Sequence, residues 1–312
     1  LVEQDRIADA KVEFSSLVQQ YPEDDELRYS LALVCLEAKA WDEAKGYLEE
    51  LIARDSHVDS AHLNLGRIAE ERNDPQGALI EYAQVRPGND YLPAQLRLTD
   101  ILINNGRTAE AQRRLAAERD EQPDYVIQLY LIESETLAAN KQGDKAWKVL
   151  QQALEKYPDD LNLLYTRAMQ AEKRNDLAQM EKDLRQIIKR DPDNAMALNA
   201  LGYTLSDRTT RYAEAKALIE QAHQINPEDP AVLDSLGWVH YRLGNLDEAE
   251  RYLRLALDRF PDQEVAAHLG EVLWANGKQR EARQIWGKFL KEQPDSPILR
   301  STIKRLTGSE TL

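Results

Sequence analysis

The sequence predicts an all-α protein that repeats one small unit of two antiparallel helices. Prolines recur at nearly equal intervals, small residues recur at one place in each unit, and apolar residues recur at helical spacing between them. No stretch alternates apolar and polar residues as a half-buried strand would. We therefore expect a helical solenoid, in which each unit packs on its neighbours instead of around one central core.

The prolines set the period of the array. From Pro123 onward, successive prolines lie 35, 34, 35, 34 and 33 residues apart. The full set is Pro22, Pro123, Pro158, Pro192, Pro227, Pro261 and Pro294. A proline stops a helix, because its ring cannot continue the backbone hydrogen-bond pattern. A period of this length that is kept over most of a chain indicates an array of helical units.

The unit is plainest between Pro230 and Asp262. Its first predicted helix carries a stripe at helical spacing, formed by Leu233, Leu236 and His240. A Gly-Asn pair at 244–245 then predicts a turn. A second stripe predicts the returning helix, and it is formed by Ala249, Leu253 and Ala256. The unit is therefore predicted to be a helical hairpin.

Eight copies align between residues 25 and 295. They begin at Asp25, Asp59, Leu92, Ile127, Leu161, Ala195, Pro230 and Gln263. The eighth residue is small in all of them: Ala32, Gly66, Thr99, Ser134, Ala168, Gly202, Gly237 and Gly270. The middle of the second helix is alanine in seven: Ala44, Ala78, Ala111, Ala146, Ala215, Ala249 and Ala282. Small residues at both places predict that the two helices of each unit approach closely.

The two ends depart from the repeat. Residues 1–24 predict only the second helix of a truncated copy, so we expect further repeats, and a targeting signal, upstream. Residues 296–312 predict a capping helix and tail. Ser296 is a suitable N-cap, Pro297 suits a first turn, and Gly308 is a suitable end.

Two irregularities give local predictions. Most copies have leucine at the seventh position, but two adjacent copies have Glu133 and Arg167 there. This predicts an ion pair across the seam between the copies, and the alternative is that both groups reach solvent. The copy from Ala195 carries an insertion near Thr209, which predicts a longer loop between its helices.

Composition and motifs exclude several function classes. The formal charge is −15, from 55 acidic and 40 basic residues, which disfavours nucleic-acid binding. No apolar run reaches membrane-spanning length, and the single Cys35 allows no intrachain disulfide. No phosphate-binding loop, zinc-ligand motif or nucleophile elbow occurs. The sequence therefore predicts no catalytic residue, no metal and no cofactor.

The repeat resembles the tetratricopeptide repeat (TPR), a helix-turn-helix unit of about 34 residues with small residues and a proline at matching places. The resemblance covers nearly the whole chain. It implies a right-handed superhelical solenoid, in which the first helices of the units line a concave surface. It also implies that this surface binds protein partners.

The positions that face this surface, on that resemblance, are the second, fifth, ninth, twelfth and thirteenth of each copy. They give the candidate partner-binding residues Asn199, Tyr203, Asp234, Trp238, Tyr241, Arg242 and Trp274. Exposed aromatic rings beside an arginine are typical of interface hot spots. The alternative is that Trp238 and Trp274 pack against the neighbouring copy.

Residues 191–294 are also similar to a narrower group, the TPR lipoproteins of Gram-negative outer membranes, which include adaptors of carboxyl-terminal processing proteases. This resemblance implies a periplasmic adaptor, tethered by a lipid anchor upstream, that presents protein substrates such as cell-wall hydrolases to a protease. One alternative is an assembly scaffold of an envelope secretion or pilus machine. Another is the regulatory TPR domain of a larger enzyme. The alternative to a periplasmic location is the cytoplasm.

Overall fold

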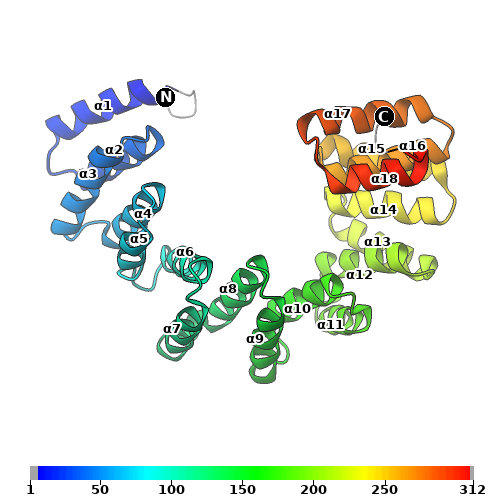
Figure 1. Cartoon of the computed structure of the whole chain (residues 1–312), viewed down its shortest axis with the longest axis horizontal. Helices are drawn as coiled ribbons and strands as arrows, with labels where there is room; N and C mark the ends of the chain where they lie inside the picture. Colours follow the sequence, from blue (N-terminus) through cyan, green and yellow to red (C-terminus); the bar gives the residue numbers. More distant parts are fainter. Residues whose placement is uncertain (1–5, 310–312) are drawn as a thin grey trace. The chain divides into compact units, whose positions relative to one another are not determined.

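The computed structural model describes residues 6–309, and in that part it consists of α-helices, turns and one 3₁₀ segment, with no strand (Figure 1). The helices follow one another as antiparallel pairs. This confirms the all-α solenoid that the sequence predicts. Residues 1–5, which begin the predicted truncated copy, and residues 310–312, which end the predicted tail, lie outside the described residues.

The contacts among the helices divide the chain into two compact units, Leu1–Pro158 and Asp159–Leu312. The first contains α1 (Ile7–Gln20), α2 (Asp25–Glu37), α3 (Trp41–Ala53), α4 (Val58–Glu71), α5 (Pro75–Tyr82), α6 (Tyr91–Asn104), α7 (Thr108–Glu121), η2 (Pro123–Tyr125), α8 (Val126–Ala139) and α9 (Gly143–Lys156). The second contains α10 (Leu161–Lys173), α11 (Leu177–Arg190), α12 (Ala195–Arg208), α13 (Tyr212–Ile225), α14 (Pro230–Arg242), α15 (Leu246–Arg259), α16 (Gln263–Ala275), α17 (Gln279–Glu292) and α18 (Pro297–Thr307).

The helix ends follow from a few residue types. Every one of the seven periodic prolines lies two residues after the end of a helix, as Pro261 does after α15. An Asp or Asn then precedes several first helices, and its side chain accepts a hydrogen bond from a backbone N–H of the first turn. These capping residues are Asp24, Asp160, Asn194, Asp229 and Asp262. Each first helix begins at or within one residue of the start that the repeat alignment gives.

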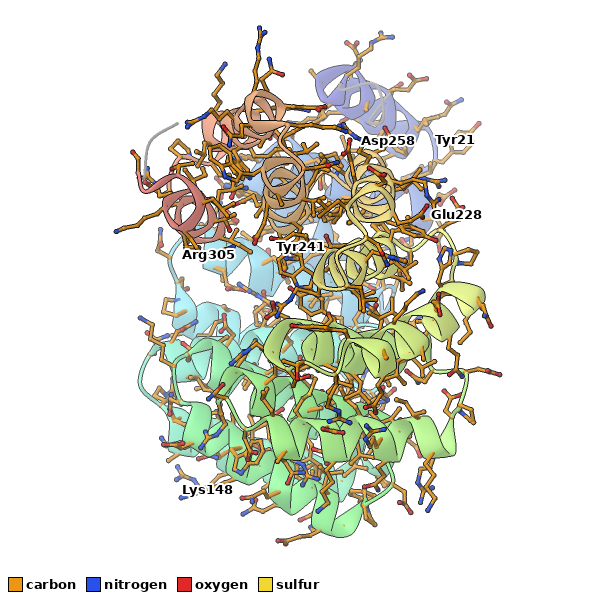
Figure 2. The ribbon with its side chains drawn as sticks, turned by 90° about the vertical axis from the view of Figure 1, so that its right-hand side faces the viewer. Tyr21, Lys148, Glu228, Tyr241, Asp258 and Arg305 are labelled. Atoms are coloured by element: carbon orange, nitrogen blue, oxygen red, sulfur yellow. The ribbon has the colours of Figure 1, made fainter. Side chains whose placement is uncertain are left out.

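The small residues allow close packing inside each helix pair. A methyl group on Gly66 would overlap the ring of Tyr82, and one on Gly237 would overlap Leu253. The same holds for Gly202 against Ile219 and for Gly270 against Trp286. The prediction of close approach is therefore confirmed at these four pairs. Many charged side chains lie on the outside of the helix pairs, and those of Lys148, Glu228 and Asp258 are exposed (Figure 2).

The predicted ion pair between Glu133 and Arg167 is wrong. The Glu133 carboxylate lies 2.6 Å from the guanidinium of Arg119 on α7, and it is buried. Arg167 on α10 instead forms two hydrogen bonds, of 2.7 and 2.8 Å, with Asp183 on α11. Neither charge is left in solvent, so the alternative is also wrong. A first helix packs on a second helix, and that helix supplies the nearer opposite charge in both cases.

The predicted longer loop near Thr209 is also wrong. Helix α12 has 14 residues and α14 has 13, whereas the turns after them, 209–211 and 243–245, have the same length. The inserted residue therefore extends the helix. The Thr209 hydroxyl donates to the carbonyl of Leu205 at 2.6 Å and accepts from the N–H of Arg211 at 3.0 Å. This side-chain cap replaces the left-handed residue, Gly244 with φ of +83°, that makes the turn after α14.

At the C-terminal end, α18 covers the last helix pair. The Ser296 hydroxyl caps its first turn, and Gly308 ends it with φ of +78°, as predicted. Leu299 and Ile303 are fully buried against α16 and α17, where they pack in one cluster with Trp286. The last repeat of the second unit is thereby shielded from water.

Candidate functional site

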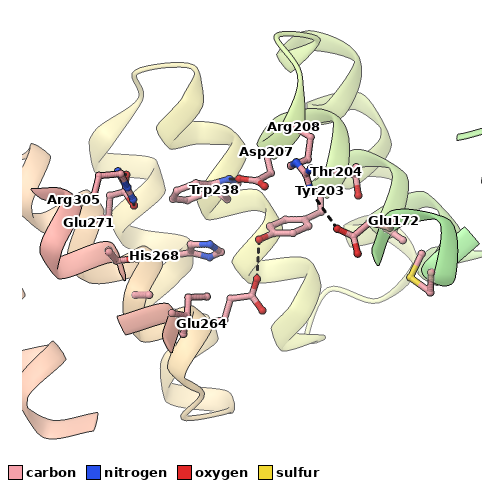
Figure 3. A pocket seen from close by; sticks show the side chains of 15 residues that line it. Glu172, Tyr203, Thr204, Asp207, Arg208, Trp238, Glu264, His268, Glu271 and Arg305 are labelled. Carbon is pink, nitrogen blue, oxygen red and sulfur yellow. Dashed lines mark hydrogen bonds and ion pairs between the residues drawn. The ribbon is translucent and has the colours of Figure 1, made fainter. Parts of the chain in front are cut away.

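The second unit has a recess of about 480 Å³ on the side formed by its first helices and α18. Figure 3 shows the side chains that converge there from α10, α12, α14, α16 and α18. Those used below are Glu172, Tyr203, Asp207, Arg208, Trp238, Glu264, His268, Glu271 and Arg305. We call this the large recess. It joins aromatic rings with carboxylates, two arginines and a histidine.

Tyr203 lies at the centre of the large recess (Figure 3). Its hydroxyl donates a hydrogen bond of 2.8 Å to Glu264 of α16, two repeats further along the chain. Burial raises the pKa of Tyr203 well above its usual range, and the Glu264 carboxylate adds to this. The phenol therefore stays protonated and acts as a fixed donor. The sequence prediction places Tyr203 on this face, and the structure agrees.

Trp238 is only 6% exposed. Its ring stacks on the imidazole of His268 from the next repeat, with the centroids 4.1 Å apart, and its indole N–H donates to Asp207 at 3.2 Å. The expectation of an exposed anchor is therefore wrong for Trp238, and the alternative of packing against the neighbouring copy holds. The ring forms a wall of the large recess instead of projecting from it.

Asp234 and His268 form a buried pair behind the Trp238 ring. The Nδ1 atom of His268 lies 3.0 Å from both carboxylate oxygens of Asp234. Burial alone lowers the pKa of His268, but the charge and hydrogen bond of Asp234 outweigh it, so the pKa lies above its ordinary value. Asp234 thus holds His268 in place, and its carboxylate is not free to bind a partner alone.

A second ion pair borders the large recess. Glu271 of α16 is buried and accepts two hydrogen bonds, of 2.8 and 2.5 Å, from Arg305 of α18. The hydroxyl of Tyr241 also donates to Glu271, at 3.2 Å. The carboxylate raises the pKa of Arg305, which stays charged.

The remaining candidates have structural contacts of their own. Arg242 donates to the hydroxyl of Tyr212 at 2.8 Å and to the carbonyl of Asp207 at 3.3 Å. Trp274 stacks on Trp286 of its own repeat, with centroids 5.9 Å apart. Tyr241, Arg242 and Trp274 line neither the large recess nor the smaller recess beside it.

The small recess, of about 260 Å³, adjoins the large one and shares Ala200, Tyr203 and Glu264 with it. Its other walls include Asn199, Asp234, Pro230, Ala231, Phe260 and Val265. Phe260 is 59% exposed, which is a large apolar surface to leave in water. The Oδ1 atom of Asn199 is buried and has no hydrogen-bond partner in the structure.

Sequence reasoning misses several residues of the two recesses. Asp207 and Glu264 occupy the thirteenth and second positions of their copies, so the repeat pattern itself could have found them. His268 and Phe260 occupy positions that the pattern does not assign to this face. Arg305 comes from the capping helix, which has no repeat position at all.

Two other findings concern the described residues 6–309. No group of three or more His, Cys, Asp or Glu side chains there is arranged to hold a metal ion. None of the helices there has both the length and the apolar character needed to cross a membrane.

Three family models, each described as a tetratricopeptide repeat, match the chain. One matches residues 1–65 and 209–269, a second matches 40–91 and 165–230, and a third matches 268–296. The chain belongs to the tetratricopeptide-repeat family. TPR proteins are suited to protein–protein interaction and are generally non-catalytic scaffolds, and no catalytic family is matched.

Among curated proteins, this TPR chain is 69% identical over 254 residues to the TPR repeat-containing protein PA4667 of Pseudomonas aeruginosa. The match covers 81% of this chain but 43% of that protein, so the chain spans less than half of its relative. It is also 31% identical over 108 residues to bacteriophage adsorption protein A of Escherichia coli, which is 35% of this chain and 11% of that protein.

Solved structures share the TPR fold at low sequence identity. A tetratricopeptide repeat protein from Parabacteroides merdae superposes with a TM-score of 0.57 at 15% identity, over 70% of this chain and 86% of that one. PilW, described as a widely conserved type IV pilus biogenesis factor, gives a TM-score of 0.54 at 17% identity, over 69% of this chain and 100% of its own. At such identities the likeness shows the fold alone.

Proposed function

We propose that this TPR protein is a non-catalytic adaptor that brings protein substrates, such as cell-wall hydrolases, to a carboxyl-terminal processing protease of the bacterial envelope. The first-helix face of the second unit holds one of these protein partners. A lipid anchor upstream tethers the adaptor to the outer membrane on its periplasmic side. The observation that supports a binding role most directly is the large recess with its fixed aromatic and charged side chains.

The large recess is preorganised for binding. Tyr203 is held by Glu264, Trp238 by Asp207 and His268, and Arg305 by Glu271. A site whose side chains are already fixed loses little conformational entropy when a ligand enters. Aromatic rings and arginines also dominate the binding energy of protein interfaces. These features favour a protein segment as the ligand.

The envelope and protease parts of the proposal rest on similarity. Residues 191–294 resemble TPR lipoprotein adaptors of Gram-negative bacteria, and the chain is 69% identical to a TPR protein of Pseudomonas aeruginosa. Most of the residues that line the large recess lie within that stretch. The proposed partner site and the resemblance therefore overlap over most of the site's residues.

A quantitative pull-down tests the proposed function. The chain is used as bait in an envelope extract of Pseudomonas aeruginosa, and the recovered proteins are compared with those from a double variant, Tyr203→Ala with Glu264→Gln. The matched control changes two exposed residues of second helices, Leu255→Ser with Glu220→Gln. We expect the parent and the control to recover a protease and cell-wall hydrolases, and the double variant to lose at least one of these classes.

Other outcomes would decide against parts of the proposal. Equal recovery by the parent and the double variant would place the partner site elsewhere. Recovery of secretion or pilus components alone would replace the adaptor with the scaffold alternative. Circular dichroism of the variants must match that of the parent, because a loss of helicity would itself remove binding.

A further inference from the structure

The small recess contains a buried acceptor that nothing in the protein satisfies. The Oδ1 atom of Asn199 is buried without a hydrogen-bond partner. A buried polar atom without a partner is costly, so native proteins keep few of them, and each calls for an explanation. Asn199 lines the small recess, and we infer that a ligand that enters there supplies the missing partner. The missing partner is an N–H group, which every non-proline residue of a peptide main chain supplies.

The walls around Asn199 favour an apolar side chain. Pro230, Ala231 and Val265 line the small recess, and Phe260 borders it with 59% of its surface exposed. A leucine or phenylalanine side chain that fills the recess would cover the Phe260 ring and be removed from water itself. Burial of apolar surface is the main favourable term in such contacts. The small recess therefore favours a ligand with an N–H donor for Asn199 and an apolar group for the walls. A segment of extended peptide supplies both.

The large recess contains two carboxylates, those of Asp207 and Glu264, whose hydrogen bonds come from neutral donors. Glu264 accepts a hydrogen bond from the Tyr203 phenol, and Asp207 accepts one from the Trp238 indole. These donors are neutral, so neither carboxylate is neutralised by them. The other acidic groups differ, because Glu172 faces Arg208 and Glu271 is paired with Arg305. His268 and Asp234 cancel each other when the imidazole is protonated.

A long cationic side chain would complement the charge of these two carboxylates. Figure 3 shows Asp207 above the Tyr203 ring and Glu264 below it. The apolar stem of a lysine or arginine can lie along such rings while its charged end meets a carboxylate. An acidic segment would instead meet like charge.

We propose that the two recesses form one site for an extended protein segment in which an apolar residue neighbours a lysine or arginine. The apolar side chain fills the small recess beside Phe260. The cationic side chain enters the large recess between Asp207 and Glu264. A main-chain N–H of the segment donates to Asn199. This inference rests on the proposed function, and it adds the chemistry of the segment that the first-helix face selects.

The test uses the whole chain and synthetic peptides of defined composition. Twelve-residue peptides of Gly and Ser, blocked at both ends, carry one Leu and one Arg at separations of one to four residues. Their affinities are measured by fluorescence anisotropy at fixed ionic strength. We expect at least one separation to bind, with a dissociation constant about ten-fold lower than those of the same peptide with Leu→Ser or Arg→Gln. Replacement of Arg by Glu should abolish binding.

Variants of the protein assign each part of the peptide to its recess. Glu264→Gln should weaken the preference for Arg over Gln, since Asp207 remains, and leave the preference for Leu over Ser. Phe260→Ser should do the reverse. Each has a control on a second helix, Glu220→Gln for the charge and Leu255→Ser for the apolar surface, and both controls should bind like the parent.

A scan of N-methylated peptides tests the role of Asn199. Methylation of one main-chain nitrogen removes its proton, and at one position this should weaken binding to the parent about ten-fold. The same methylation should have little effect on the Asn199→Ala variant, because the acceptor is already gone. Equal losses in both proteins would contradict the assignment of that hydrogen bond.

The proposed chemistry of the bound segment and the proposed adaptor function are tested by different outcomes. The segment chemistry is overturned if no peptide binds, if acidic peptides bind best, or if Glu264→Gln leaves the preference for Arg unchanged. The proposed function still stands in those cases when the pull-down depends on Tyr203 and Glu264. If the recovery of partners in the pull-down is also unchanged when these residues are replaced, both proposals fail together.

Discussion

Two charged side chains inside the helix stack, Glu133 and Arg167, are held by opposite charges from adjacent helices. Arg119 holds Glu133, and Asp183 holds Arg167. The repeat pattern shows that both depart from leucine, but it cannot show their partners, because these lie on other helices at positions that vary between copies. For the same reason the pattern places Trp238 on the correct face and misjudges its depth. His268 of the next repeat covers its ring.

Removal of Arg167 should destabilise the second unit strongly. Asp183 has no exposed surface, so Arg167→Ala leaves a buried carboxylate without its opposite charge. Breaking a buried pair from one side costs about 3–5 kcal/mol. We expect this loss in urea unfolding of the chain, followed by circular dichroism. The double variant Arg167→Met with Asp183→Leu should recover most of it, and a loss under about 1 kcal/mol in the single variant would contradict the account.

Stability should depend on pH through His268. Its pKa in the folded state is raised by Asp234, with smaller contributions from Glu264 and Glu271. A raised pKa means that the folded protein holds the proton more tightly than the unfolded chain, whose value is about 6.5. The contribution is therefore full below about pH 6.5 and is lost as the pH rises through the folded pKa. His268→Gln should remove this dependence above about pH 6.5, and an unchanged slope would count against it.

At the scale of helices, the sequence predicts positions well because the determinants are local. A proline after most second helices and an Asp or Asn before most first helices set the ends, as Pro261 and Asp262 do between α15 and α16. The turn after α12 is the exception. Its shape depends on the Thr209 hydroxyl, which caps the helix and absorbs the insertion. Whether a residue is added to a helix or to a loop is decided by such a bond, which spacing alone does not predict.

The close approach of paired helices gives a matched test with two glycines. A methyl group on Gly237 would overlap Leu253, whereas one on Gly46, within α3, would meet nothing within 4 Å. Overpacking a tight interface costs about 1–3 kcal/mol. Replacing an open helical glycine by alanine instead stabilises by up to about 1 kcal/mol. We therefore expect Gly237→Ala and Gly46→Ala to shift the urea midpoint in opposite directions, and shifts of the same sign would refute the packing argument.

At the scale of the whole molecule, the structure consists of two compact units, and the candidate site lies entirely in the second. The repeat period predicts the number and direction of the helices. It does not predict the boundary between the two compact units. The site residues are predicted in part, with Tyr203 and Asn199 found from their repeat positions. Arg305 and Phe260 could not be found in this way, since they belong to the capping helix and to an inter-repeat turn.

The capping helix should be needed by the second unit and by its site. Ending the chain at residue 295 would expose the apolar surface around Trp286 and remove Arg305, the partner of Glu271. Solenoids need a terminal element with a polar outer face to stay soluble. We expect the truncated chain to self-associate in analytical ultracentrifugation and to unfold at lower urea concentration. A monomer with unchanged stability would show that α18 is dispensable.

The central claim is that protein partners bind on the first-helix face of the second unit. Photo-crosslinking tests it most directly, with p-benzoylphenylalanine placed at Phe260 beside the small recess or at Leu255 on the second helix of the same repeat. Both positions are exposed, so both substitutions should be tolerated. The account predicts that proteins recovered in the pull-down crosslink from position 260 and not from position 255. Crosslinks from position 255 alone, or equally from both, would contradict it.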